Sequence, residues 1–177
     1  MSDLIPQTSS LKPRIFFASD HAGFALKNAL MEHLATRGYE VEDVGALALD
    51  PSDDYPDFVT PLAQRVAEEN ARVADSARAV VVGGSGQGEA MAANRVNGIR
   101  AAVFYGPMRV TETLDIEGGR SEDGYDNIRL ARRHNDANML AIGARFVSGK
   151  DADEAVRIFL ETPFSNSPRH ARRLAKF

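Results

Sequence analysis

The chain of 177 residues contains no cysteine. Without thiols it has no disulfide, no thiolate metal site and no cysteine nucleophile, and it is compatible with a reducing cytoplasm, where we expect the protein to reside. No apolar run reaches membrane-spanning length, and residues 1–12 lack the apolar core of a signal peptide. We therefore expect no membrane association, and we interpret residues 1–12 as a loose leader and residues 13–177 as a single domain.

An excess of positive charge is also lacking, because 21 Lys and Arg residues face 25 Asp and Glu residues. This balance gives no overall reason to expect a nucleic-acid partner. Several basic residues nevertheless gather in the C-terminal segment 167–177, SPRHARRLAKF. Such a tail is most often a solvated helix face. Arg169 and Arg173 are four residues apart, however, so on a helix they would share one face and could bind one phosphate together.

Strand-like and helix-like patterns alternate along the chain. Short apolar runs predict strands at 14–18, 39–44, 77–82, 99–104 and 139–142. Helical spacing predicts helices at about 26–37, 58–67, 89–96 and 151–160, the last capped by Asp151, and two more before His134 and after Ser167. The alternation predicts an α/β fold class with a parallel sheet and helices on both faces. The long acidic and glycine-rich segment from Gly106 interrupts this rhythm, and a loop of this length is usually a lid, an interface or disordered.

The run VVVGGSGQGEAMAANR, residues 80–95, places a glycine-rich turn between a predicted strand and a helix. It lacks the Lys-Ser/Thr pair of a P-loop and does not match G-x-G-x-x-G in frame, and Glu89 would repel a pyrophosphate. Two interpretations remain for the turn alone. It is either a packing turn of small residues, or a site that offers backbone N–H groups beside a carboxylate base.

Polar side chains follow several of the predicted strands. Asp20 and His21 follow the first strand, Ser85 and Glu89 the third, and Arg145 the fifth. Each has an ordinary explanation as a helix cap, a loop residue or surface charge. Because the carboxyl ends of parallel strands meet at one edge, however, their convergence favours a ligand site there. The segment that contains His134 and Asn135 precedes the fifth strand, so these residues fall at its amino end unless they reach a neighbouring subunit.

Five motifs together resemble the ribose-5-phosphate isomerase B family, which also includes galactose-6-phosphate isomerase subunits. They are SDHAGFALK (19–27), DDYPD (53–57), GGSGQGEAMAANRVNGIRAA (83–102), RHNDANMLAIGAR (133–145) and SPRHARR (167–173). The resemblance covers most of residues 14–173, with the motifs in the family's order. It implies a three-layer Rossmann-like fold with five parallel strands, and a homodimer or homotetramer whose sites are shared through the C-terminal helix.

The resemblance also implies aldose–ketose isomerisation of a phosphorylated sugar without metal or other cofactor. Glu89 corresponds to the base of the subgroup that uses glutamate, whereas other members use a cysteine at the position of Gly83. His134 corresponds to the acid associated with opening of the sugar ring. The implied substrate-binding residues are Asp20, His21, Tyr55, Gly84, Ser85, Gly86, Gln87, Gly88, Asn135, Arg145, Arg169 and Arg173.

Two features depart from the compact members of the family. The segment around residues 113–128 is longer and lies directly upstream of His134, and the chain ends soon after Arg173. Two alternatives to a ribose 5-phosphate isomerase therefore stay open: an isomerase of a hexose 6-phosphate or tetrose phosphate, and a non-catalytic sugar-phosphate binding protein. Fold alone does not separate them. The presence of both Glu89 and His134 favours catalysis.

Overall fold

The computed structural model describes residues 12–114 and 119–176. Residues 1–11 of the predicted leader therefore lie outside the described residues. Lys12, the last residue assigned to that leader, is positioned against the domain, because its Nζ lies 4.2 Å from the centroid of the Tyr39 ring.

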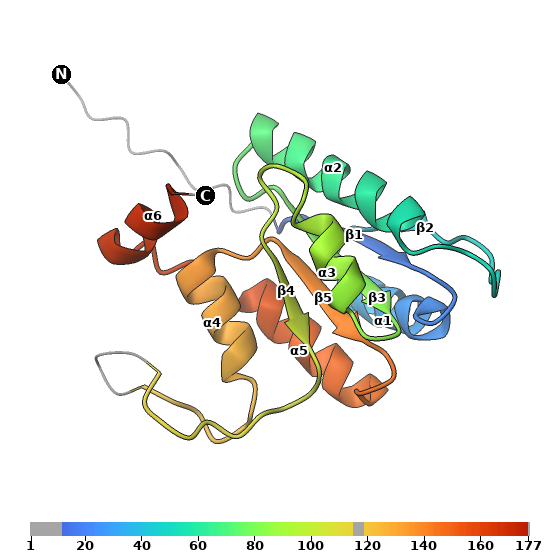
Figure 1. The fold of residues 1–177 in the computed structure, drawn as a ribbon. Helices are drawn as coiled ribbons and strands as arrows, with labels where there is room; N and C mark the ends of the chain where they lie inside the picture. The colour runs from blue at the N-terminus through green and yellow to red at the C-terminus, as the bar shows by residue number, and fades with distance from the viewer. Residues whose placement is uncertain (1–11, 115–118, 177) are drawn as a thin grey trace.

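Five parallel strands form a single sheet at the centre of the molecule (Figure 1). The strands are β1 (Arg14–Ser19), β2 (Val41–Gly45), β3 (Ala77–Gly83), β4 (Ala101–Phe104) and β5 (Met139–Gly143). Their order in the sheet is β2-β1-β3-β5-β4, and every neighbouring pair is parallel. All five strands predicted from the apolar runs are confirmed, with boundaries that differ by at most two residues.

Within residues 12–114 and 119–176, six helices accompany the strands, and five of them cover the two faces of the sheet (Figure 1). They are α1 (Phe24–Thr36), α2 (Pro56–Arg72), α3 (Gln87–Ala93), α4 (Asp126–Asn135), α5 (Gly149–Glu161) and α6 (Pro168–Leu174). The predicted cap of α5 was wrong: the helix begins at Gly149, two residues before Asp151, and Ser148 is its N-cap. The hydroxyl of Ser148 accepts a hydrogen bond from the Asp151 N–H, while the Asp151 carboxylate accepts from that hydroxyl.

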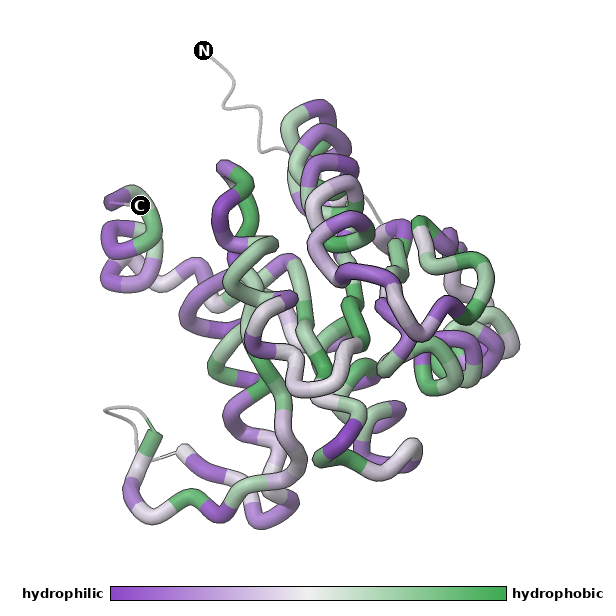
Figure 2. Tube along the Cα trace, turned by 45° about the vertical axis from the view of Figure 1, so that its right-hand side comes forward, coloured by the Kyte–Doolittle hydropathy of each residue, from purple (hydrophilic) through white to green (hydrophobic). Residues whose placement is uncertain are grey.

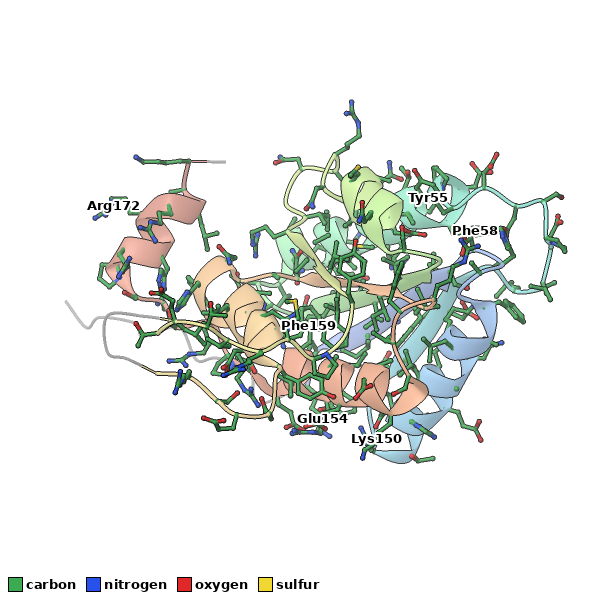
Figure 3. The ribbon with its side chains drawn as sticks, turned by 60° about the horizontal axis from the view of Figure 1, so that its bottom comes forward. Tyr55, Phe58, Lys150, Glu154, Phe159 and Arg172 are labelled. Carbon is green, nitrogen blue, oxygen red and sulfur yellow. The ribbon has the colours of Figure 1, made fainter. Side chains whose placement is uncertain are left out.

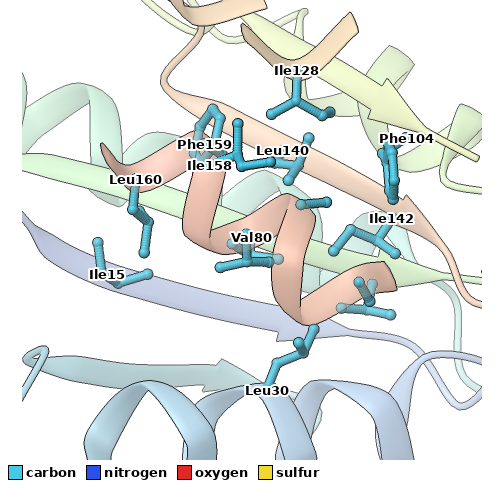
Figure 4. Close-up of a cluster of buried hydrophobic side chains, with 14 of the residues drawn as sticks. Ile15, Leu30, Val80, Phe104, Ile128, Leu140, Ile142, Ile158, Phe159 and Leu160 are labelled. Carbon is cyan, nitrogen blue, oxygen red and sulfur yellow. The ribbon is translucent and has the colours of Figure 1, made fainter. Parts of the chain in front are cut away.

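The core consists of two apolar layers, because alternate residues of each strand point to opposite faces. On one face, α1, α4 and α5 pack on the longer side chains of the strands, and Figure 4 shows Leu30, Ile128 and Phe159 around Val80. On the other face, α2 and α3 pack on smaller residues such as Ala18, Ala79 and Ala141. In Figure 2 the sheet accordingly forms an apolar centre with hydrophilic residues on the outer helix faces.

The connection from β4 to α4 is long, as the sequence predicts, and it begins at the carboxyl end of the sheet. Helix α4 then returns to the amino ends of the strands, where Asn138 donates its backbone N–H to the Arg100 carbonyl. Helix α6 follows α5 and lies beside α4, away from the sheet (Figure 1). None of the helices in the described residues is both long enough and apolar enough to cross a membrane.

Candidate active site at the carboxyl edge of the sheet

The glycine-rich turn lies between the carboxyl ends of β3 and β5. Gly83 is in register with Gly143, and the Gly83 and Gly84 carbonyls accept hydrogen bonds from the N–H groups of Ala144 and Arg145, at 2.8 and 3.2 Å. Gly86 has a φ of 74°, a conformation that favours glycine because L side chains rarely adopt it. These contacts hold the turn rigidly at the end of the sheet and start α3 immediately after it.

Glu89 projects from the first turn of α3 into the space beside Gly83, and only 3% of the residue is exposed. A Cβ atom added at Gly83 would have three atoms of the Glu89 side chain within 3.0 Å as its nearest neighbours. The carboxylate therefore occupies the volume that any larger side chain at position 83 would need. Glycine at 83 and glutamate at 89 are structurally coupled.

Burial raises the pKa of Glu89 above its ordinary value of 4.5. The backbone N–H groups of Glu89 itself and Gly86 stabilise the charged form and act in the opposite direction, as does Arg145, whereas the charge of Asp20 adds to the increase. Loss of hydration outweighs the N–H groups because the carboxylate is almost completely buried. A carboxylate with a raised pKa is a stronger base once it is ionised, which suits proton abstraction.

Asp20 and His21 lie beside the turn, as the sequence predicts, and they are joined by Asp53 from the loop between β2 and α2. The Asp20 carboxylate accepts hydrogen bonds from the N–H groups of Ala22 and Gly23, and so shapes the chain before α1. The Asp53 Oδ1 atom lies 2.6 Å from His21 Nδ1 and also accepts the His21 backbone N–H at 3.0 Å. One carboxylate thus fixes both the backbone and the ring of His21.

Asp20, His21 and Asp53 are also the group of described residues that could hold a metal ion, since their ligand atoms lie within 4.8 Å of one another. The 2.6 Å separation of His21 Nδ1 and Asp53 Oδ1 is that of a hydrogen bond. Two ligands on one tetrahedral zinc ion would be about 3.4 Å apart. The observed spacing therefore fits a proton between the two atoms, and a metal would require them to separate.

Arg145 and Tyr55 flank the turn on its two sides. A Cβ atom at Gly84 would lie 3.1 Å from the guanidinium carbon of Arg145, and one at Gly88 would lie 2.7 Å from the Tyr55 ring. The Arg145 charge lowers the pKa of both Glu89 and His21, so it lies within electrostatic reach of both groups. Ser85 contributes its hydroxyl, which accepts a hydrogen bond from the Gln87 N–H at 3.3 Å.

The remaining predicted residues form a second cluster at the junction of α4 and α6. The rings of His134 and His170 lie 4.1 Å apart, and the Ser165 N–H donates to the Arg133 carbonyl. Burial and the charges of Arg169, Arg173 and Arg133 lower the pKa of His170. This concentration of positive charge is suited to an anion. Asn135, the last residue of α4, is exposed nearby.

The two clusters lie at opposite ends of the sheet. His134 precedes the amino end of β5, whereas the glycine turn adjoins its carboxyl end, and a five-residue strand spans about 15 Å. Figure 3 shows the same separation, with Tyr55 near α2 and α3 and Arg172 on α6 at the far side of the molecule. The predicted position of His134 at the amino end is confirmed, and the predicted site residues do not form one site within a single chain.

Two side chains at the carboxyl edge are buried and had no predicted role, those of Asp53 and Lys27. Asp53 belongs to the DDYPD motif, but its contact with His21 joins positions that are 32 residues apart. Lys27 is completely buried and donates to both carboxylate oxygens of Asp43 and to the Ala46 carbonyl. It thereby ties α1 to the start of the loop that carries Asp53 and Tyr55. The only sequence signal was that both residues belong to motifs of the family.

The parallel sheet, with its polar site at the carboxyl ends of the strands, defines a Rossmann-like α/β protein of the small-molecule-binding class. The model of the Ribose/Galactose Isomerase family matches residues 15–115 and 123–177. The chain therefore belongs to this family. Residues 116–122 have no counterpart in the match, and they lie in the segment that the sequence identified as longer than usual.

Individual relatives agree with this assignment. Ribose-5-phosphate isomerase B of Mycolicibacterium paratuberculosis is 37% identical over 91% of this chain and 87% of its own length. The crystal structure of ribose-5-phosphate isomerase B from Mycoplasma genitalium with bound ribulose-5-phosphate has a TM-score of 0.78 and 34% identity, covering 94% of both chains. The Clostridium thermocellum ribose-5-phosphate isomerase B structure has a TM-score of 0.75 and 36% identity, over 92% of this chain and 93% of that one.

Proposed function

We propose that the protein is a cytoplasmic isomerase that interconverts D-ribose 5-phosphate and D-ribulose 5-phosphate through an enediolate. The observation that carries the proposal is the buried Glu89 carboxylate beside a glycine turn, in a chain of the Ribose/Galactose Isomerase family. The bound ribulose-5-phosphate of the Mycoplasma genitalium relative supports a phosphosugar as the ligand.

Isomerisation removes a proton from the carbon beside a carbonyl and returns it to the neighbouring carbon. We assign both transfers to the Glu89 carboxylate, whose raised pKa makes it a suitable base and then acid. By the family resemblance, other members carry a cysteine at the position of Gly83. The Glu89 carboxylate fills the space beside Gly83, so it stands close to where that side chain would be.

The reaction also places negative charge on the substrate oxygens. The glycine turn has preorganised backbone N–H groups that can donate hydrogen bonds to these oxygens. The Gly86 N–H already faces the Glu89 carboxylate and the Gln87 N–H is bonded to Ser85. We therefore assign oxyanion stabilisation to the N–H groups of Gly84, Ser85 and Gly88. Removing one such donor costs about 3–4 kcal/mol of transition-state stabilisation in other enzymes.

We assign the phosphate end of the sugar to His21, Arg169 and Arg173, and ring opening to His134. Because the two clusters lie at opposite ends of one chain, this assignment requires a homodimer or homotetramer in which one subunit supplies the glycine turn and another supplies α4 and α6. Asp20, Tyr55, Asn135 and Arg145 complete the sugar contacts. The cationic cluster around His170 supports the phosphate assignment.

Mixing two inactive variants tests the shared site. Glu89→Gln and His134→Ala each remove one group from every site of their homodimers. After subunit exchange, a hybrid dimer has one intact site, so about a quarter of all sites should regain activity in an equal random mixture. No recovery, despite exchange demonstrated by mass spectrometry, would contradict a site built from two subunits.

A panel of phosphosugars assayed with a chelator tests the reaction itself. We expect turnover of ribose 5-phosphate and ribulose 5-phosphate in the presence of the chelator. Turnover of a hexose 6-phosphate or tetrose phosphate instead would assign a different substrate to the same chemistry. Binding without turnover of any sugar would favour the non-catalytic alternative, and loss of activity with the chelator would contradict a metal-free reaction.

A further inference from the structure

Asp53 makes an unusually close and buried contact with His21. Only 7% of the Asp53 side chain is exposed, against 34% for His21, and the Oδ1–Nδ1 distance is 2.6 Å. The same oxygen accepts the His21 backbone N–H, so the imidazole is fixed relative to its own main chain. With Nδ1 turned to Asp53, the ring has Nε2 left as its second hydrogen-bonding atom.

The second oxygen of Asp53 makes this contact costly unless the imidazole is charged. Asp53 Oδ2 is buried and has no hydrogen-bond partner within the described residues. A buried carboxylate that lacks partners is strongly disfavoured unless a positive charge lies against it. Among the contacts of Asp53, the imidazole ring of His21 is the group that can supply this charge.

The other charged groups that face His21 act in both directions. Asp20 lies beside it in the chain and favours the imidazolium, and the charge of His21 is in turn felt by Asp50. Arg145 and the partial loss of hydration favour the neutral ring. The hydrogen bond to Asp53 is the largest of these influences, and the pKa of His21 is raised above 6.5 as a result.

We propose that Asp53 is a positioning residue that orients His21 and keeps it as an imidazolium, so that Nε2–H donates a charge-assisted hydrogen bond to the phosphate of the substrate. The proposal rests on the assignment of His21 to the phosphate end under the proposed function. Asp53 itself does not touch the sugar phosphate in this scheme. Its contribution is a phosphate site that keeps its charge at pH values where an ordinary histidine is neutral.

The charge of His21 is measured first, without substrate. The protein has four histidines, and NMR titration with His21→Gln as the assignment control isolates the His21 signal. In the folded wild type we expect His21 to titrate with a midpoint above the histidine midpoint of the urea-unfolded chain. In Asp53→Asn we expect the His21 midpoint to shift clearly downward. Asp54→Asn is the matched control, because it removes the same charge from an exposed neighbour in the same loop.

Phosphate affinity is measured second, by calorimetry with ribose 5-phosphate in a Glu89→Gln background that prevents turnover. One pH unit above an ordinary pKa of 6.5, only about a tenth of a histidine is protonated. Asp53→Asn should therefore bind about tenfold more weakly than Asp54→Asn at that pH. The difference should shrink as the pH falls below 6.5, because His21 is then protonated in both variants.

Three results separate the possible failures. A wild-type midpoint at or below that of the unfolded chain overturns the proposal even if Asp53→Asn does not fold. A raised midpoint with a pH-independent loss of affinity in Asp53→Asn also overturns it, since a merely structural role would weaken binding equally at every pH. A raised midpoint that Asp53→Asn lowers, in a protein that binds inorganic phosphate but no phosphosugar, would sustain the Asp53–His21 pair and contradict the proposed function instead.

Discussion

Replacing Gly83 with alanine should displace the Glu89 carboxylate from the site. The new methyl group would overlap the side chain of Glu89, whose atoms are its three nearest neighbours, all within 3.0 Å. Because Gly83 lies at the buried end of β3, the backbone has little room to move. Overpacking of this kind costs about 1–3 kcal/mol of unfolding free energy. Loss of a positioned base should also lower the isomerisation rate by about 10²–10⁴-fold.

A double-mutant cycle isolates the clash from other effects of the substitution. In a Glu89→Ala background the space beside position 83 is empty, so Gly83→Ala should cost little there. The coupling free energy between the two substitutions should be about 1–2 kcal/mol, within the range for residues in direct contact. Urea unfolding at one fixed protein concentration measures all four proteins, because the stability of an oligomer depends on concentration.

Gly84→Ala is the matched stability control, since its methyl group would meet the exposed and flexible Arg145 side chain at 3.1 Å. We expect this variant to lose less stability than Gly83→Ala, and to lose the same amount with or without Glu89. If Gly83→Ala lowered the unfolding free energy equally with Glu89 and with Ala at position 89, the packing of the carboxylate against Gly83 would be refuted. A fully active Gly83→Ala variant would show that catalysis does not require the Glu89 carboxylate to lie beside Gly83.

Three further predictions test other parts of the structure. A pH titration followed by carbon NMR should give the Glu89 carboxyl a midpoint above pH 4.5, and the basic carboxylate is lost as the pH falls through this raised pKa. A titration midpoint at or below 4.5 would contradict the effect of burial. Arg173→Ala should weaken binding of ribose 5-phosphate by about 10–100-fold, the loss expected for a hydrogen bond to a charged group, whereas Arg172→Ala should bind normally. Unchanged affinity in Arg173→Ala would make the α6 arginines ordinary surface charge. Lys27→Met should lower the unfolding free energy by about 3–5 kcal/mol because it leaves Asp43 without its cation, and an effect no larger than that of the exposed Lys150→Met would contradict this.

The elements of the fold were predictable because their signals are local. The apolar run of β1 and the helical spacing of Leu26, Leu30 and Leu34 in α1 each lie within a short stretch of sequence. The order of the strands has no such signal, because it depends on how all five pack against the helices. The cap of α5 was placed on Asp151 rather than Ser148, since both residue types favour this position and the local pattern does not separate them.

The site was predictable only in part, and for a related reason. The rule that carboxyl ends meet at one edge brought Asp20, Glu89 and Arg145 together correctly. The partner of His21 lies in a different loop, so no spacing pattern indicated Asp53. The raised pKa of Glu89 follows from the burial of its carboxylate, and this burial depends on the packing of α3 against the sheet rather than on a local sequence pattern.

The proposed function depends above all on Glu89, which transfers the proton between the two carbons of the sugar. This role is tested directly by the exchange of the transferred hydrogen with solvent deuterium, which proton NMR of ribose 5-phosphate and ribulose 5-phosphate detects. We expect isomerisation with deuterium incorporation in the wild type, and neither isomerisation nor exchange in a Glu89→Gln variant that still binds the sugar. Exchange at a near-normal rate in Glu89→Gln would contradict the role of Glu89, because the proton would then be removed by another group.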